Sequence, residues 1–80
     1  MSTTIMDLEP SLNIKMALLQ QEVNSAVSAR WQLEMRLRVN KRIGSDKSVI
    51  DQIIAELERL EKYLAALDDE SKTLANGDKP

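Results

Sequence analysis

Residues 50–74 read IDQIIAELERLEKYLAALDDESKTL, and their large apolar side chains recur in alternating steps of three and four. This spacing places them at positions a and d of a heptad, lettered abcdefg, which is the pattern of a helix that packs lengthwise along another helix. The seam consists of Ile50, Ile53, Leu57, Leu60, Leu64, Leu67 and Leu74, with Ser71 as its polar member. The stretch therefore predicts a long amphipathic helix.

A second heptad pattern precedes this one. Its d positions hold Leu12, Leu19, Ala26 and Leu33, and its a positions hold Met16, Val23 and Leu37. Arg30 interrupts the seam at an a position, and Asn40 interrupts it at a d position, where an amide is more typical of a specificity device or a cap than of a ligand contact. A second apolar line on the same helix comprises Val27, Trp31, Met35, Val39 and Ile43. Two apolar lines on one helix predict contact with more than one neighbour.

Turn and cap residues separate the two patterns. Gly44 suits the left-handed conformation that ends a helix. Ser45, Asp46 and Ser48 are the candidate N-caps of the second helix, and Ser48 with Asp51 has the spacing of a capping box. Asp7 or Ser11 can cap the first helix. The predicted fold is all-α: an antiparallel two-helix hairpin of coiled-coil type. Its expected parts are a flexible arm over residues 1–10, a helix over 11–43, a turn over 44–47, a helix over 48–75 and a disordered tail over 76–80.

The length of the chain favours assembly into a larger bundle. Eighty residues allow one small domain, and the absence of cysteine and histidine removes disulfides and nearly every common zinc site. Folding the chain back at Asp46 leaves residues before Ala17 without an opposite number, an overhang of about 10 Å. We therefore expect a homo-oligomeric helical bundle, with dimer, trimer and tetramer all open.

The expected interface, with further copies of the chain and with a larger protein, combines both apolar lines. Its residues are Leu12, Met16, Leu19, Val23, Val27, Trp31, Leu33, Met35, Leu37, Ile50, Ile53, Leu57, Leu60, Leu64 and Leu67. Trp31 is read as an anchor of this interface, because tryptophan is enriched at binding hot spots. A stacking platform for a base is the alternative.

Charge is unevenly distributed along the chain. The whole chain has a net charge of −2, whereas residues 29–47 contain six basic and two acidic residues, a net charge of +4. The candidate anion-binding residues are Arg30, Arg36, Arg38, Lys41, Arg42 and Lys47. Such a cluster can hold a nucleotide, a nucleic acid or an acidic protein, or it can be neutralised by Asp51, Glu56 and Glu58 of the second helix. Arg30 has Glu61 or Tyr63 as its expected structural partner, with an anionic ligand as the alternative.

Composition argues against an enzyme. Without histidine or cysteine the usual nucleophile and base pairs are missing, and the acidic residues have the placement of a solvated helix flank. We expect no cofactor and no metal. No signal peptide is visible and no run approaches the roughly 18 apolar residues of a membrane helix, so we expect a cytoplasmic protein that does not bind membranes.

The region around the turn carries a resemblance. The run from Ile43 through Gly44, Ser45 and Asp46 to Ile50, Ile53 and Ile54 resembles small coiled-coil proteins of tailed phages, including tail-fibre assembly chaperones. This resemblance implies a phage or prophage origin and assigns no functional residue. Together these features predict an adaptor, assembly factor or inhibitor of a larger protein. The alternatives are a phage counter-defence protein that sequesters a small anionic ligand such as a nucleotide, and nucleic-acid binding through the basic tip.

Overall fold

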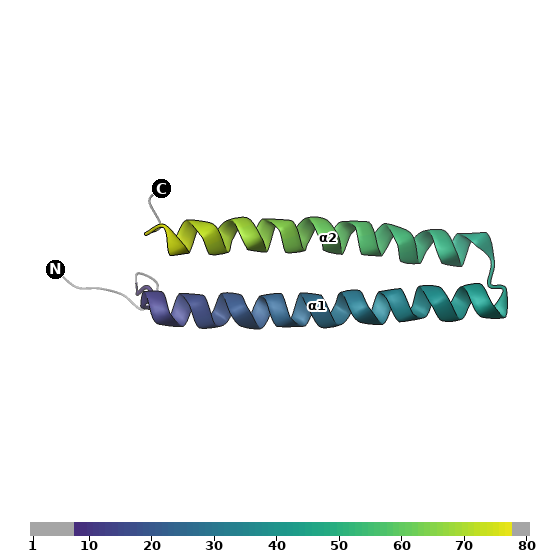
Figure 1. Cartoon of the computed structure of the whole chain (residues 1–80), viewed down its shortest axis with the longest axis horizontal. Coiled ribbons are helices and arrows are strands. Elements are labelled where there is room, and N and C mark those ends of the chain that lie inside the picture. The colour runs from purple at the N-terminus through teal and green to yellow at the C-terminus, as the bar shows by residue number, and fades with distance from the viewer. Residues whose placement is uncertain (1–7, 78–80) are drawn as a thin grey trace.

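The computed structural model describes residues 8–77, which form two long helices side by side (Figure 1). Helix α1 spans Leu12–Ile43 and helix α2 spans Lys47–Ala75. They run in opposite directions and are joined by a tight turn, so the all-helical hairpin predicted from the heptads is confirmed. The expected arm over 1–10 and tail over 76–80 fall mainly on residues 1–7 and 78–80, which lie outside the described residues.

The ends of α1 follow from two small residues. The Ser11 side chain accepts a hydrogen bond from the Ile14 amide at 3.3 Å, which satisfies one of the free amides of the first turn. Gly44 ends the helix in the left-handed region at φ 71°, and Lys41 and Arg42 lie in the last turn, where the helix dipole favours positive charge. Ser11 and Gly44 are thus caps, as expected.

Helix α2 begins earlier than the expected capping box. Asp46 is the N-cap residue and makes no cap hydrogen bond through its side chain, while Ser48 lies inside the first turn. The predicted pairing of Ser48 with Asp51 as a capping box is therefore wrong. Asp51 instead forms an ion pair with Lys47, one turn earlier on the helix, with 3.3 Å between Lys47 Nζ and Asp51 Oδ2.

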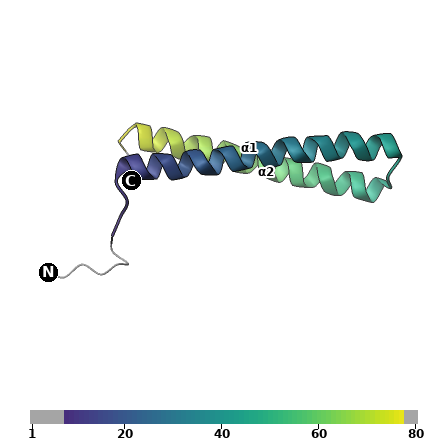
Figure 2. The same ribbon diagram turned by 90° about the horizontal axis from the view of Figure 1, so that it is seen from below.

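The core of the hairpin is a single seam between α1 and α2. Viewed from below, the ribbons cross near mid-length, so the helices wind around each other at a shallow angle (Figure 2). The most buried side chains are all at d positions: Ala26, Leu33, Ile53, Leu67 and Leu74, each at most 9% exposed. None of the described side chains is completely buried, which is the expected result for a two-helix seam with solvent on both sides.

The two helices end almost level at the open end of the hairpin (Figure 1). Because the turn is centred on Ser45, an a residue of one helix lies level with a d residue of the other, as Leu37 does with Ile53. The last residue of α2, Ala75, therefore reaches the level of Lys15. The expected overhang of about 10 Å is wrong, since α1 extends only about one turn further.

Candidate functional site

The residues expected at an interface divide into two sets. Ten are buried or half-buried in the seam and hold α1 against α2 within one chain: Leu19, Val23, Leu33, Leu37, Ile50, Ile53, Leu57, Leu60, Leu64 and Leu67. The other five are exposed: Leu12, Met16, Val27, Trp31 and Met35. Only the exposed set is available to another molecule, so the candidate interaction surface lies on α1.

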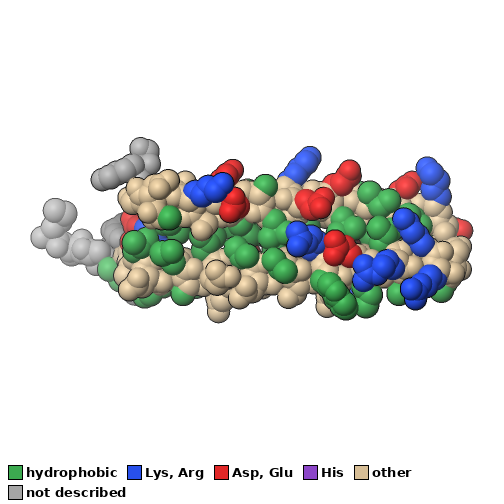
Figure 3. All heavy atoms as spheres, viewed as in Figure 1, with side chains coloured by type: hydrophobic (Ala, Val, Ile, Leu, Met, Phe, Trp, Pro, Cys, Tyr) green, Lys and Arg blue, Asp and Glu red, His purple; other side chains and the backbone are tan. Residues whose placement is uncertain are grey.

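The outer face of α1 consists of the residues that point away from α2. Heptad positions b, c and f lie opposite the a and d seam, and on α1 they include Trp31, Met35 and Val39. The Trp31 side chain is 56% exposed, more than a structural tryptophan in a core would be. Apolar side chains gather along the edge of α1 that is remote from α2 (Figure 3).

Two members of this face were not predicted from the heptad pattern. Ile14 and Leu18 are both 53% exposed and lie at f and c positions near the start of α1. The signal was present, because both residues fall outside the a and d seam, yet an isolated apolar pair in the first turns of a helix did not stand out as a line. The outer face therefore has an apolar patch at each end.

The centre of the outer face is small and polar. Gln21, Ser25, Ser28 and Gln32 separate the two patches, and all four are exposed. Corresponding positions on α2 hold polar or charged residues such as Gln52, Glu58, Arg59, Lys62 and Asp69, and the apolar residues among them are alanines, at 55, 65 and 66. The large apolar side chains that α2 exposes, Val49 and Ile54, lie beside its seam. The contrast means that α2 has one apolar face, whereas α1 has two.

The basic tip, defined as Arg36, Arg38, Lys41, Arg42 and Lys47, surrounds the turn end of the hairpin (Figure 3). All five side chains are exposed. Lys47 pairs with Asp51, but within residues 8–77 the other four form no ion pair, so the expected neutralisation by α2 occurs at one residue only. The four cations occupy different heptad positions, and in a single chain they encircle α1 rather than converge on one point.

Arg30 is half-buried in the seam. It forms no hydrogen bond or ion pair with the described residues, so its predicted pairing with Glu61 or Tyr63 is wrong. Tyr63 instead donates a hydrogen bond from its hydroxyl to Oε1 of Glu22 at 2.7 Å. This bond raises the pKa of Tyr63, because the phenol must give up the proton that it donates to Glu22; the negative charge of the carboxylate adds to the effect.

Asn40 joins the last turn of α1 to the loop. Its Nδ2 donates to the Arg36 carbonyl at 2.7 Å, and its Oδ1 accepts from the Ser45 hydroxyl at 2.7 Å. The Ser45 amide also donates to the Asn40 carbonyl at 3.0 Å. The polar interruption of the seam therefore holds the turn, while the C-cap residue of α1 is Gly44.

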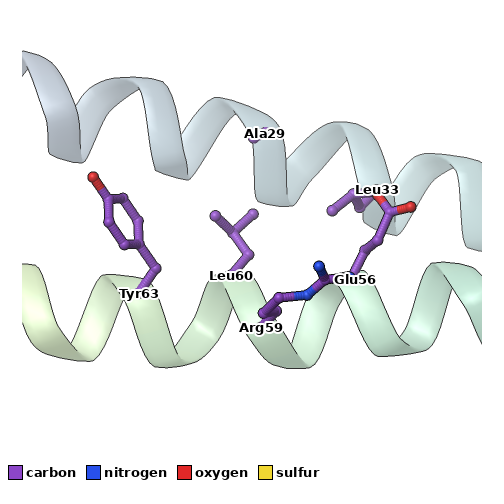
Figure 4. Close-up of a pocket in the computed structure, with 6 residues that line it drawn as sticks. All are labelled: Ala29, Leu33, Glu56, Arg59, Leu60 and Tyr63. Atoms are coloured by element: carbon purple, nitrogen blue, oxygen red, sulfur yellow. The ribbon is translucent and has the colours of Figure 1, made fainter.

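A groove of about 510 Å³ runs along one side of the hairpin. Leu60 projects from α2 toward Ala29, whose small methyl group leaves space between the helices (Figure 4). Tyr63 reaches toward α1 on one side of Leu60, and Glu56 and Arg59 lie on the other side. The groove is open to solvent along its length. Sites for small ligands enclose most of the ligand surface, so the groove alone is a poor site for one.

Two further findings concern the chemistry of residues 8–77. No group of three or more acidic, histidine or cysteine side chains in this part of the chain is arranged to hold a metal ion. Neither α1 nor α2 has an apolar stretch of the length needed to cross a membrane.

Comparison of the chain with protein-family models, curated proteins and solved structures finds no match.

Proposed function

We propose that this chain is a non-enzymatic coiled-coil interaction protein, which assembles with itself and acts as an adaptor, assembly factor or inhibitor of a larger protein. The observation that carries the proposal is the exposed apolar outer face of α1. An exposed apolar patch on a small protein is characteristic of an interaction site, and this face has one such patch at each end. A cytoplasmic location and a phage or prophage origin are parts of the same proposal.

The energetics of the hairpin support assembly. Five side chains are buried, all at most 9% exposed, whereas Ile14, Leu18, Trp31 and Val39 leave about half of their surface in water. Burial of apolar surface stabilises by about 25 cal/mol per Å², so covering these side chains favours a complex. A two-helix chain without disulfides has little stability of its own, which adds to the advantage of a partner.

The test compares the wild-type protein with the variant Trp31→Ala/Met35→Ala. Native mass spectrometry and light scattering should give an oligomer for the wild type and a shift toward monomer for the variant. The control variant is Arg59→Ala/Lys62→Ala, which removes two exposed side chains from the outer face of α2 and should keep the wild-type mass. Far-ultraviolet circular dichroism checks that all three remain helical. A monomeric wild type at high micromolar concentration would contradict the proposal.

Anion binding at the basic tip is the second candidate function. It is favoured by Arg36, Arg38, Lys41 and Arg42, which have no ion-pair partner among the described residues. An oligomer can bring the tips of several chains, with Arg30, around one phosphate-bearing molecule.

Thermal unfolding with a panel of cyclic and linear nucleotides tests this candidate. A ligand at 100 times its dissociation constant adds about 2.7 kcal/mol and raises the unfolding temperature. No shift with any nucleotide would contradict the candidate. Binding of an oligonucleotide that weakens steeply with salt would assign the tip to nucleic acid instead.

A further inference from the structure

We propose that the outer face of α1 binds the same face of a second copy, with the two α1 helices antiparallel about a twofold axis. This inference rests on the proposed self-assembly of the chain and specifies its geometry. Twofold dimers are the commonest soluble oligomers, and their interfaces require one surface to be complementary to itself.

The outer face of α1 meets this requirement. Its c and f positions form a line of ten residues in alternating steps of three and four: Ser11, Ile14, Leu18, Gln21, Ser25, Ser28, Gln32, Met35, Val39 and Arg42. All ten side chains are exposed. From the middle of this line outward, each direction has a serine, then a glutamine, then two apolar residues.

Antiparallel pairing about the middle of this line matches like with like. Ser25 lies opposite Ser28 of the partner, and Gln21 lies opposite Gln32 of the partner. Further out, both apolar patches are covered, because Leu18 meets Met35 and Ile14 meets Val39. A shift by one heptad in either direction instead places apolar residues against glutamine, serine or arginine, so the pattern selects one register.

Small side chains at the centre let the helices approach closely. Interaxial distances of 8–10 Å depend on the size of the side chains at the contact. Ser25 and Ser28 lie at the proposed axis, and Ala29 flanks them. The two centres therefore permit close contact, while the longer side chains interdigitate on either side of them.

The flanks of the proposed interface add an ion pair. In the α1/α2 seam, Glu22 and Tyr63 occupy flanking positions, and their hydrogen bond of 2.7 Å shows how such positions meet in an antiparallel pair. The same geometry applied to the outer face places Arg36 beside Glu22 of the partner, and Trp31 over Ala17 of the partner. Glu22 uses Oε1 for Tyr63, and a carboxylate accepts further hydrogen bonds through its second oxygen. Arg36 has no ion-pair partner within the described chain.

Charge favours the same orientation over the parallel one. The open end of the hairpin, residues 8–22 and 64–77, contains five acidic and two basic residues. An antiparallel dimer places the α1 part of this end beside the segment 29–47 of the partner, which has a net charge of +4, while the three acidic residues at 68–70 lie one helix further away on α2. A parallel dimer would place the two basic segments side by side, where like charges repel.

The resulting dimer is a flat array rather than a four-helix bundle. Each α1 has its seam on α2 and its outer face on the partner's α1, and these faces lie on opposite sides of the helix. The order across the array is α2, α1, the partner's α1 and the partner's α2. The two basic tips point in opposite directions, so this dimer does not gather them around one anionic molecule, and the second candidate function requires a different assembly.

Cysteine cross-linking tests the orientation, and the chain contains no cysteine to interfere. We would make Gln21→Cys, Gln32→Cys and, as a control on the outer face of α2, Gln52→Cys. Oxidation of a mixture of the first two chains should give a disulfide-linked heterodimer, because the two positions face each other. Gln21→Cys alone should not cross-link, since its two copies lie about 16 Å apart along the axis. Gln52→Cys should form no disulfide either, because its position lies outside the proposed interface.

A charge exchange tests the register. Glu22→Arg and Arg36→Glu should each weaken dimerisation about tenfold, because the twofold axis repeats each repulsive contact. The double variant Glu22→Arg/Arg36→Glu should recover wild-type affinity to within about threefold. Tyr63→Phe is the control for the hydrogen bond that Glu22→Arg also removes. If the losses of dimerisation affinity in the two single variants simply add in the double variant, the proposed pairing is overturned.

The two levels of the proposal fail differently. If the wild type is an oligomer and Gln21→Cys cross-links with itself, the antiparallel orientation is overturned and self-assembly is not. An oligomer in which neither Gln21→Cys nor the mixture cross-links shows that another surface is used, which also overturns the inference. A monomer by native mass spectrometry overturns both the inference and the proposed function.

Discussion

The Tyr63 hydroxyl donates a hydrogen bond to Oε1 of Glu22 at 2.7 Å, joining residues 41 positions apart in the sequence. Among the described residues, it is the one hydrogen bond that joins a side chain of α1 to a side chain of α2. It fixes the helices against sliding, because a slip of one turn would move the two groups about 5 Å apart.

This bond makes the stability of the hairpin depend on pH at the alkaline end. The bond raises the pKa of Tyr63 above its usual value of 10, and Glu22 contributes most of that effect. A raised folded-state pKa gives stability that is fully present below the unfolded value and is lost as pH rises through the folded value. We therefore expect the wild type to be more stable than Tyr63→Phe at pH 8, and the difference to disappear above the folded pKa of Tyr63.

Absorbance at 295 nm measures that titration directly, because Tyr63 is the only tyrosine in the chain. Glu22→Gln removes the charge of the acceptor and should return the midpoint toward 10. An unchanged midpoint in Glu22→Gln would show that the carboxylate does not perturb the phenol.

Gly44→Ala should destabilise the hairpin by about 1 kcal/mol. Gly44 has φ 71°, a conformation in which a Cβ is strained even though no atom lies within 4 Å of it. The matched control is Gly77→Ala, which also has positive φ but follows the last turn of α2, where local unwinding relieves the strain. Chemical denaturation measures both. Equal effects would show that the turn does not limit stability.

Arg30→Leu should stabilise the hairpin by about 1 kcal/mol. Arg30 occupies an a position, is half-buried and has no partner among the described residues, so a leucine would extend the apolar seam. Arg38→Leu removes the same charge from an exposed position and should give no such gain. Lower stability in Arg30→Leu would reveal a favourable contact of the guanidinium group. Loss of nucleotide binding together with higher stability would assign Arg30 to a ligand.

Leu33→Ala should cost about 2–3 kcal/mol, at the lower end of the range for a buried leucine, because the seam is two helices thick and collapses easily. Leu33 is 9% exposed, whereas Leu8 is 66% exposed outside the helix. Leu8→Ala is therefore the control and should cost less than about 0.5 kcal/mol. Similar midpoints in urea for the two variants would contradict the seam as the source of stability.

Most of the fold could be predicted from local rules. The steps of three and four in residues 50–74 determine that α2 has one apolar face, and Gly44 determines where α1 stops. The predictions for Ser48 and Arg30 failed for a different reason. Several residues near the turn can cap a helix equally well, and the reach of a long side chain depends on neighbours across the seam. A heptad pattern therefore specifies neither the N-cap residue nor the partner of a long side chain.

By itself, the sequence determined the class of the molecule: two heptad helices joined at a glycine stop, in a chain without histidine or cysteine. The tertiary structure decided which apolar residues remain for another molecule. The packing of α2 on the a and d seam buries one face of α1 and leaves Trp31, Met35 and Val39 exposed to water. The physical reason is that the packing of a neighbouring helix decides which apolar side chains are buried and which stay exposed. The same leucine spacing describes a core or an interface until the partner helix is placed.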